Sequence, residues 1–447
     1  MTEDIVALSK QAADIVTSFP PLTKIRVVSH YDADGITAAA ILCKALYRAG
    51  YDFHVSLMRN PFDKGLERVK KEDNELIILS DMGSGQIETL EQFNCKIIII
   101  DHHQYLKKEV ADHVIQINAN LCGINGNYEA SGASLSFAVA IALSNKNADL
   151  APLALAGVMG DKQYISGIRG YNKTLLDEAL NNGYLTQKTS IKLSGETLFD
   201  ALYYSIDPYY GGLSGNKKAI EKLIESLHLE KTIKTEELND DQKRNLHSIL
   251  MFSLIKKRCQ QNILDTVIRE RYYSNIVHGE LERFADLLDA CGKGGNRGLG
   301  LATCLGDTES FKEALSLEKK YKQTILDELL RLEKEGFEEK KSFRYFYSID
   351  SSLGGVIGGI ATNYILDSKK PLLSLVRNDD ELHVSCRGNQ ELVRIGLDLG
   401  GAMKEVATKL QGHGGGHQIA AGATIDVDKE EQFLDMVDSI ISNQMEK

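Results

Sequence analysis

Three short, continuously apolar runs separated by helical patterns constrain the fold of this chain more than any other feature. The runs predict buried strands: KIRVVS at 24–29, ELIILS at 75–80 and KIIIIDHH at 96–103. Helical patterns accompany them at residues 35–50, 130–143 and 151–160. Apolar strands joined through helices are typical of a parallel sheet covered on both faces. We therefore predict an α/β fold whose N-terminal domain holds a parallel sheet flanked by helices.

The middle of the chain has a helical and highly charged pattern. Residues 240–272 and 307–342 carry apolar residues at helical spacing, and the second of these segments predicts a long connecting helix. Their charge runs are typical of a solvated face. Between them, residues 291–298 read CGKGGNRG, which is not a Walker A loop because a glycine follows Lys293. We expect a flexible loop there; the alternative is that Lys293 and Arg297 line a path for nucleic acid.

The alternation of strands and helices returns beyond residue 342. Strands are predicted at 343–349, 372–377 and 381–386, and helices at 354–367 and 396–410. This pattern indicates a second, smaller α/β domain. Because 447 residues exceed what one hydrophobic core usually supports, we divide the chain into a catalytic domain at 1–190, a mainly helical linker and insertion at 191–340, and a substrate-binding domain at 341–447.

The composition narrows the class of protein. With 52 basic and 63 acidic residues the net charge is −11, which excludes a basic protein that coats nucleic acid through phosphate contacts alone. No apolar run approaches the roughly 20 residues of a membrane span, and the N-terminus lacks the pattern of a secretory signal. The seven cysteines are scattered and never form CxxC, so neither a disulfide framework nor a structural zinc site is expected. We expect a cytoplasmic protein with no membrane partner.

Acidic and histidine side chains follow the predicted strands and one helix. They are His30, Asp32 and Asp34 after the first strand, Asp81 after the second, Asp101, His102 and His103 at the third, and Asp161 after the helix at 151–160. The carboxyl ends of neighbouring parallel strands open onto one crevice, where ligands bind. Taken alone, an aspartate at a strand end is usually a helix cap or turn former. Their coincidence at one edge of the sheet favours a shared site.

A cluster of this composition predicts bound cations. Carboxylates packed together repel one another and take up protons unless a cation relieves the repulsion. Carboxylate and imidazole ligands without a thiolate suit Mn²⁺ or, as the alternative, Mg²⁺. Six ligands are too many for a single ion that must also hold substrate, so we expect two divalent ions that activate water for attack on phosphorus.

Four segments carry a family resemblance. VVSHYDADGITAAAIL, LSDMG, IIIIDHHQ and ALAGVMGD resemble, in order and spacing, the four motifs of the DHH phosphoesterase superfamily. The tail, with VSCRG and then GLDLGGAMKEVATKLQGHGGGHQIAAGATI, resembles its DHHA1 substrate-binding domain. The opening SHYDADGIT and the segment Ala290-Cys291-Gly292 are most similar to the archaeal RecJ-like nucleases, which are similar to bacterial RecJ and to the GINS-associated cofactor of the replicative helicase.

The resemblance implies roles for the clustered residues. The metal-ligand positions fall on His30, Asp32, Asp34, Asp81, His102 and Asp161. Asp81 matches the bridging ligand, His103 the donor that faces the scissile phosphate, and Asp101 the residue that orients the neighbouring histidine. His30 departs from the pattern, because it stands two residues before Asp32 where several relatives have four.

The glycine-rich tail is the second candidate site. Gly414, Gly415 and Gly416 let the backbone approach a phosphate closely, and His417 can donate a hydrogen bond to it. Arg387 follows a predicted strand and is a second candidate phosphate contact. Without the first domain, a glycine-rich hairpin with an exposed histidine explains this stretch as well.

Taken together, these features predict a RecJ-like, two-metal exonuclease that hydrolyses single-stranded DNA or RNA to nucleoside monophosphates. One alternative is a phosphodiesterase of short oligoribonucleotides or cyclic dinucleotides, although the long middle segment argues against a compact enzyme of that kind. The other is a largely non-catalytic replication scaffold that binds GINS, although such a scaffold has no physical reason to keep the ligand set. The resemblance implies GINS and the replicative helicase as further partners.

Overall fold

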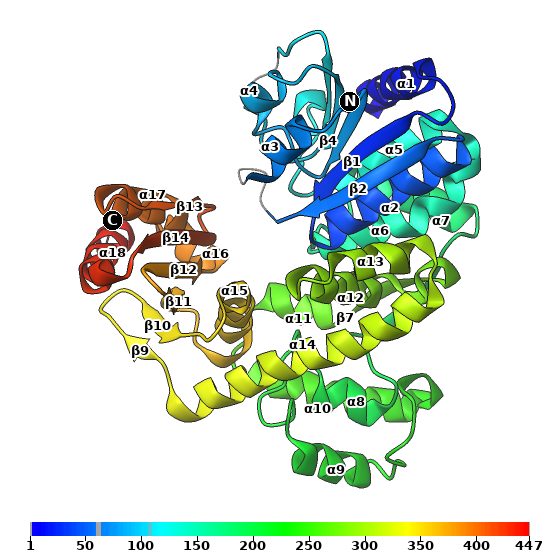
Figure 1. Ribbon diagram of the computed structural model, residues 1–447. Helices are drawn as coiled ribbons and strands as arrows, with labels where there is room; N and C mark the ends of the chain where they lie inside the picture. Colours follow the sequence, from blue (N-terminus) through cyan, green and yellow to red (C-terminus); the bar gives the residue numbers. More distant parts are fainter. Residues whose placement is uncertain (1, 60–63, 107–108, 447) are drawn as a thin grey trace. The chain divides into compact units, whose positions relative to one another are not determined.

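A computed structural model of the chain describes residues 2–59, 64–106 and 109–446 (Figure 1). They form two compact units, of which the first comprises Met1–Ser190 with Arg269–Glu318 and the second Ile191–Ile268 with Lys319–Lys447. Residues 269–318, from within the expected helical linker, thus pack with the N-terminal unit. All seven cysteines are free thiols, and no described helix is long and apolar enough to cross a membrane.

The first unit contains most of the predicted α/β pattern. Its elements are α1 Thr2–Ser18, β1 Lys24–His30, α2 Ala33–Arg48, β2 Asp52–Met58, α3 Lys64–Lys70, β3 Leu76–Ser80, α4 Ile87–Leu90, β4 Lys96–Asp101, β5 Val114–Asn118, α5 Gly132–Leu143, α6 Ala151–Gly160, α7 Gly170–Asn181, β6 Thr186–Ile191, β7 Ile268–Ser274, β8 Gly279–Glu280, α12 Leu281–Lys293 and α13 Arg297–Leu305. Helix α14, Thr308–Glu335, begins in this unit and ends in the second.

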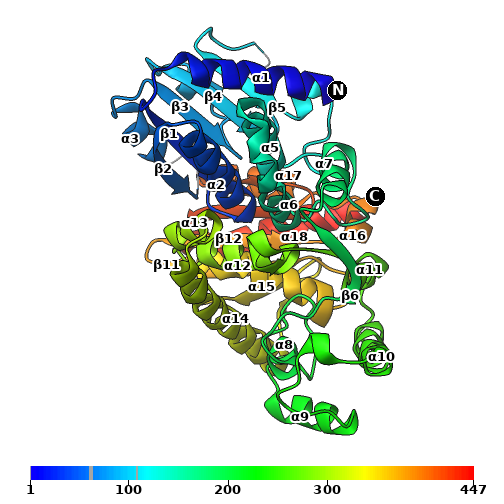
Figure 2. The same cartoon turned by 90° about the vertical axis from the view of Figure 1, so that its right-hand side faces the viewer.

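Five parallel strands form the main sheet of the first unit, in the order β2-β1-β3-β4-β5. Alternate side chains of a strand enter different cores. In β4, Ile98 and Ile100 pack with α1, α2 and α5, whereas Ile97 and Ile99 pack with α3 and α4. Helices α2 and α5 lie side by side along one face (Figures 1 and 2). The predicted parallel sheet with helices on both faces is confirmed.

The sequence analysis did not predict the two edge strands, β2 and β5. The β2 segment reads DFHVSLM and is half-exposed along its length. An edge strand has one neighbour and one partly open face, so it needs no continuous apolar run, and the pattern that identifies the central strands is absent.

The second unit combines a helical part with a second sheet. Its elements are α8 Leu198–Tyr203, α9 Lys217–Ser226, α10 Asp240–Lys256, α11 Gln261–Val267, β9 Glu338–Glu339, β10 Arg344–Tyr347, α15 Ser351–Ile360, β11 Leu372–Asn378, β12 Glu381–Arg387, α16 Gln390–Arg394, α17 Leu399–Lys409, β13 His413–Gly416, β14 Ala420–Asp426 and α18 Glu430–Met445.

The sheet of the second unit has the order β13-β14-β12-β11-β10-β9. Only β10 and β11 run parallel; the other neighbours are antiparallel. Helices α17 and α18 cover one face, where Met403 and Phe433 are fully buried. Helix α15 lies on the other face, and its core extends to α8, α9, α10 and α14. The predicted smaller α/β domain at the C-terminus is confirmed.

The predicted helix over 240–272 is wrong in its last part. Helix α10 ends at Lys256, because Arg258 takes a left-handed φ of 58°. Residues 268–274 form β7, in which the buried side chain of Arg271 pairs with Glu280 and Glu282. The periodicity of the sequence does not predict that these segments contact each other.

The predicted flexible loop at 291–298 is also wrong. Helix α12 continues to Lys293 and α13 begins at Arg297, so the glycines mostly lie in or beside helices. A Cβ atom on Gly292 would lie 2.0 Å from the carbonyl oxygen of Tyr31. This glycine lets α12 touch the turn that follows β1.

Candidate metal centre

The carboxyl ends of three adjacent strands bring the candidate residues to one edge of the first sheet. Ser29 of β1 pairs with Ser80 of β3, which pairs with Ile100 of β4, so the residues that follow stand at one level. Asp81, directly after β3, has a left-handed φ of 56°, and its N–H donates to the carbonyl of Ile100 at 2.8 Å. The predicted convergence of strand ends is therefore present.

Asp81 stands between two histidines. Its Oδ1 lies 3.1 Å from Nε2 of His102, and its Oδ2 lies 3.5 Å from Nδ1 of His30. The same nitrogen of His30 lies 2.8 Å from Oδ2 of Asp32, yet it has no hydrogen-bond partner of acceptable geometry. Asp32 also caps α2, since its Oδ1 accepts from the N–H of Gly35 at 3.0 Å. The capping role and a place in the cluster are compatible, because they use different oxygens.

His102 links the remaining carboxylates. Its Nδ1 donates to the carbonyl oxygen of Gly126 at 2.6 Å, so in the neutral ring the free lone pair is on Nε2. That Nε2 lies 3.7 Å from Oδ2 of Asp34, and Oδ2 of Asp161 lies 3.7 Å from Nδ1. All six predicted ligand residues therefore gather around Asp81 and His102.

Asp34 is buried against the N-terminus of α5. Its Oδ1 accepts from the hydroxyl of Ser131 at 2.8 Å and from the N–H of Ala133 at 3.0 Å, and its Oδ2 accepts from the N–H of Gly132 at 2.7 Å. A helix N-terminus offers unpaired N–H groups that favour a negative charge. The sequence analysis did not foresee this anchor, because it joins residues almost a hundred positions apart.

Two glycines allow helices to approach the aspartates. A Cβ atom on Gly132 would lie 2.5 Å from the Cβ of Asp81, and one on Gly157 would lie 2.5 Å from Oδ1 of Asp34. Any side chain at either position would push into the cluster. The glycines at the start of α5 and inside α6 therefore shape the site.

Asp101 and His103 form a separate pair at the rim. Nδ1 of His103 donates to Oδ1 of Asp101 at 2.8 Å, while the His103 side chain is 56% exposed. Asp101 is buried and accepts further hydrogen bonds from the N–H groups of Ser84, His102 and His103. The oxygens of Asp101 thus accept hydrogen bonds from four N–H donors.

The electrostatics of the cluster are strongly perturbed. Burial lowers the pKa of His30, but the carboxylates of Asp32 and Asp81 outweigh it and raise it to about 11. The pKa of His102 is raised well above its usual range for the same kind of reason, with Asp161 as the largest opposing charge. Burial and the neighbouring carboxylates raise the pKa of Asp34 well above its ordinary value and that of Asp161 to about 6.

These residues fit a divalent cation. Ligand atoms within 4.8 Å of one another occur in three groups: Asp81, His102 and His103; His30, Asp32 and Asp81; and Asp34, His102 and Asp161. Asp81 and His102 each belong to two of the groups, and of the two only the carboxylate has a second oxygen with which it could bridge two ions. A bound cation would relieve the repulsion between the carboxylates and would coordinate the buried His30 nitrogen that has no hydrogen-bond partner. Binding of the cation would displace protons from the histidines.

Gln163 is a positioning residue that no sequence pattern indicated. Its Nε2 donates to Oδ2 of Asp161 at 2.7 Å and to the carbonyls of Gly126 and Ala130 at 2.8 and 3.1 Å. It therefore ties the end of α6 to the segment that holds His102.

The second candidate site lies at one end of the second sheet. Arg387 pairs with Ala420 across β12 and β14, and Gly416 pairs with Ala421 across β13 and β14. Arg387, the predicted glycines 414–416 and the exposed His417 are thus neighbours in the sheet. A Cβ atom on Gly355 of α15 would lie 2.6 Å from an Arg387 nitrogen, so the guanidinium lies against a bare helix surface. Burial lowers its pKa, and no described carboxylate pairs with it.

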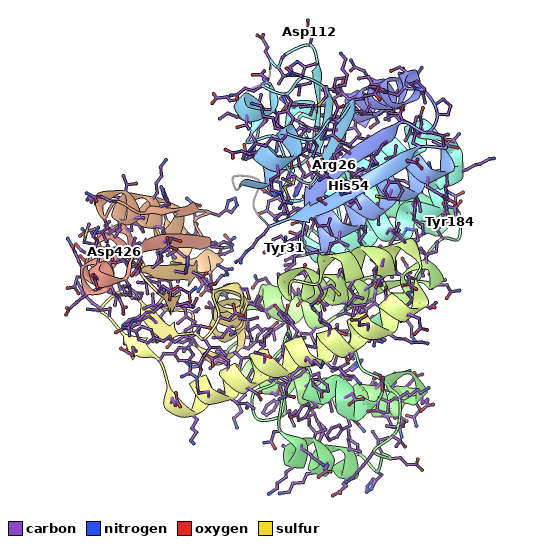
Figure 3. All side chains as sticks on the ribbon, in the orientation of Figure 1. Arg26, Tyr31, His54, Asp112, Tyr184 and Asp426 are labelled. Carbon is purple, nitrogen blue, oxygen red and sulfur yellow. The ribbon has the colours of Figure 1, made fainter. Side chains whose placement is uncertain are left out.

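A cavity of about 490 Å³ lies beside β2 in the first unit. Four arginines line it, namely Arg26, Arg59, Arg68 and Arg297, together with His54 and Glu72. Arg26 and His54 are register partners on β1 and β2 (Figure 3). Met58 at the same cavity is the register partner of His30, so the cavity reaches the sheet edge that carries the cluster. The sequence analysis missed Arg26, Arg59 and Arg68, because without β2 nothing in the sequence brought residues of β1, α3 and the segment after β2 together.

Two family models match the chain: the DHH family N-terminal domain over residues 24–158, and the DHHA1 domain over residues 344–443. An uncharacterized protein of Methanocaldococcus jannaschii is 31% identical over 432 residues, 95% of this chain and 94% of its own length. The chain belongs to the DHH family, as a RecJ-like member with a DHHA1 domain.

Other relatives of this DHH phosphoesterase are more distant. The single-stranded-DNA-specific exonuclease RecJ of Haemophilus influenzae is 26% identical over 149 residues, 30% of this chain and 25% of that protein. RecJ of Thermus thermophilus in complex with Mn²⁺ superposes with a TM-score of 0.60 at 17% identity, covering 98% of this chain and 55% of that one. CDC45 of Entamoeba histolytica superposes with a TM-score of 0.63 at 13% identity, covering 94% and 95%. These structural likenesses concern the fold.

Proposed function

We propose that the protein is a two-metal phosphodiesterase that degrades single-stranded DNA or RNA from an end to nucleoside monophosphates. The observation that carries this proposal is the convergence of His30, Asp32, Asp34, Asp81, His102 and Asp161 on one sheet edge, with Asp81 shared between two ligand groups. A chain that needed only fold stability would not concentrate buried carboxylates in this way.

These six residues would hold two divalent ions, with Mn²⁺ as the preferred metal and Mg²⁺ as the alternative. When bound, the ions supply Lewis-acid activation of water and stabilise the charge on the phosphoryl oxygens. The protein's own part is to keep each ligand oriented. The carbonyl of Gly126 fixes the tautomer of His102, and the hydrogen bonds from the N-terminus of α5 fix the orientation of the Asp34 carboxyl group.

His103 is the candidate donor to the scissile phosphate. Nδ1 of its ring is fixed by Asp101 and the side chain is largely exposed, so Nε2 is left to donate to a nonbridging oxygen or to the leaving oxygen. Burial lowers the pKa of His103, but Asp101 outweighs it and raises it to about 9, so the ring is protonated near neutral pH. Asp101 acts through His103 as a positioning residue.

The substrate class follows from charge. The chain has a net charge of −11, yet Arg59, Arg68 and Arg297 line the cavity beside β2, where Arg26 is paired with Glu72. Arg387, which pairs with no described carboxylate, lies near strand β13. Local positive charge of this kind suits a chain of phosphates. We assign residues 1–190 to catalysis, 191–340 to a mainly helical insertion and 341–447 to substrate binding, with Gly414, Gly415, Gly416, His417 and Arg387 as phosphate contacts.

The decisive test is digestion of single-stranded DNA and RNA labelled at either end, with Mn²⁺, Mg²⁺ or EDTA. We expect mononucleotide products with either metal and none with EDTA. The Asp81→Ala variant is the control for a contaminating nuclease. The small-substrate alternative is tested in parallel with cyclic dinucleotides and short oligoribonucleotides. It gains support if the protein cleaves only these substrates.

A second candidate is a replication scaffold that binds GINS and the replicative helicase. The fold likeness to CDC45 over nearly the whole chain favours it. Capture of GINS by the purified protein, without hydrolysis of any strand under all metal conditions, would support this candidate over the nuclease.

A further inference from the structure

Tyr128 and Arg169 lie beside the metal centre and have no part in the chemistry proposed above. Tyr128 is 48% exposed and lies in the turn over residues 126–129. The guanidinium carbon of Arg169 lies 5.7 Å from the centre of the tyrosine ring. Its hydrogen bonds go to the carbonyls of Ser166 and Gly167, and no carboxylate of the described residues pairs with it. An exposed ring and an unpaired cation thus meet on the surface.

The turn that carries Tyr128 is tied to the ligand cluster. The carbonyl of Gly126 accepts from Nδ1 of His102 at 2.6 Å and from Nε2 of Gln163 at 2.8 Å, and Gln163 also holds Asp161. Tyr128 follows Gly126 by two residues, over which a chain extends at most about 7 Å. The Cα atom of Tyr128 therefore lies within about 7 Å of the Cα atom of Gly126, whose carbonyl holds His102.

The loop that carries Arg169 is fastened to the same turn. A Cβ atom on Gly170 would lie 2.4 Å from the Cβ of Glu129, and the N–H of Asn172 donates to the carbonyl of Glu129 at 2.9 Å. The loop takes left-handed φ values at Lys162 and Ser166, 56° and 66°, which only firm surroundings maintain. The spacing of ring and guanidinium is thus fixed by packing on both sides.

We propose that Tyr128 and Arg169 form a nucleotide subsite, in which the ring stacks on a nucleobase and the guanidinium contacts an adjacent phosphate. This inference rests on the proposed function and narrows its substrate to a base-bearing single strand. Stacking on an aromatic side chain is sequence-tolerant, because every base offers a π face, and it requires a base that is not already stacked in a duplex. Neither polyphosphate nor a base-free phosphodiester would use the ring.

The test measures the affinity of the full chain for short labelled strands, with Ca²⁺ in place of Mn²⁺. One strand is ordinary DNA, and the other has abasic sugars at its terminal nucleotides. We expect Tyr128→Leu to weaken binding of the ordinary strand about 5- to 150-fold and to leave binding of the abasic strand unchanged. Tyr128→Phe keeps the ring and should bind like wild type. Arg169→Gln should reduce the salt slope by about 0.7.

Tyr47→Leu is the matched control. Tyr47 is 76% exposed in the same unit, but it lies in the last turn of α2, whose first turn lies at the metal centre. Its substitution should change neither affinity. Equal affinity of the wild type for both strands, or an equal loss on both strands in Tyr128→Leu, would overturn the subsite.

Hydrolysis with Mn²⁺ separates this inference from the proposed function. If the wild type cleaves both strands without discrimination, the nuclease assignment stands and the subsite fails. If it cleaves neither strand but Tyr128→Leu still loses affinity for the ordinary strand alone, the subsite stands and the nuclease assignment fails.

Discussion

Nδ1 of His103 donates to Oδ1 of Asp101 at 2.8 Å. The N–H groups of His102 and His103 donate to the same oxygen, and that of Ser84 donates to Oδ2. These hydrogen bonds favour a role for Asp101 in orienting the His103 ring over a role as a metal ligand. The pair joins the buried end of β4 to the exposed rim of the site.

This pairing predicts the effect of Asp101→Asn. The amide cannot accept from all of these donors, so His103 loses its orientation and kcat on single-stranded DNA should fall about 10²- to 10⁴-fold. His103→Ala should lose a similar factor, and the double variant little more, because the two act as one unit. Bound Mn²⁺, measured by elemental analysis, should stay at the wild-type level; a loss of metal would instead make Asp101 a ligand.

Metal removal should affect both activity and stability. We expect EDTA to abolish hydrolysis and Mn²⁺ to restore it. An ion that binds only the folded state at 100 times its Kd adds about 2.7 kcal/mol to the free energy of unfolding. The check is thermal unfolding at rising Mn²⁺ concentrations, with Asp81→Ala as the variant whose midpoint should respond least. Full activity in excess chelator contradicts the two-metal proposal.

Asp81→Ala should be the most damaging single substitution. It removes a ligand from both ions, so kcat/KM should fall at least ~10³-fold. His30→Ala should cost less, since His30 would contact one ion only and departs from the spacing of its relatives. The measurement is steady-state hydrolysis of a labelled strand with saturating Mn²⁺. Equal effects of the two substitutions would show that Asp81 does not bridge.

Gly132→Ala tests the close approach of α5 to the cluster. The new Cβ would lie 2.5 Å from that of Asp81, and overpacking of this kind costs about 1–3 kcal/mol. We expect weaker Mn²⁺ binding and a lower free energy of unfolding in urea. Gly85→Ala is the matched control, because a Cβ there meets nothing within 4 Å and its φ is not left-handed. A wild-type Mn²⁺ affinity for Gly132→Ala would refute the close contact.

Arg387→Ala and His417→Ala separate substrate binding from chemistry. Each lost hydrogen bond to phosphate is worth about 1.5–3 kcal/mol, so strand affinity should fall about 10- to 150-fold while Mn²⁺ binding stays intact. Arg387→Ala should also reduce the salt slope by about 0.7. Arg377→Ala is the control, since Arg377 lies toward the other end of the same sheet and pairs with Glu430. An unchanged affinity in both variants would make the tail a structural cap.

The sequence alone identified the central strands β1, β3 and β4, and with them the positions of five of the six candidate ligands; the sixth, Asp161, follows the predicted helix at 151–160. Its success has a local cause. A strand buried on both faces must be apolar along its whole length, and the residues just after it must lie at the end of the sheet. Both properties can be read within a window of a few residues. The second sheet was found through β10, β11 and β12, of which β11 is buried over Leu372–Val376 and β12 alternates between buried and partly exposed residues.

Only the tertiary structure decided what each ligand residue is fastened to. The anchoring of Asp34 by the N-terminus of α5, the hydrogen bond from His102 to Gly126 and the contact of Arg387 with α15 join segments that are far apart in the chain. The return of residues 269–318 to the first unit is a relationship of the same kind. Such contacts depend on which surfaces pack together, and periodicity describes only the face that each segment presents.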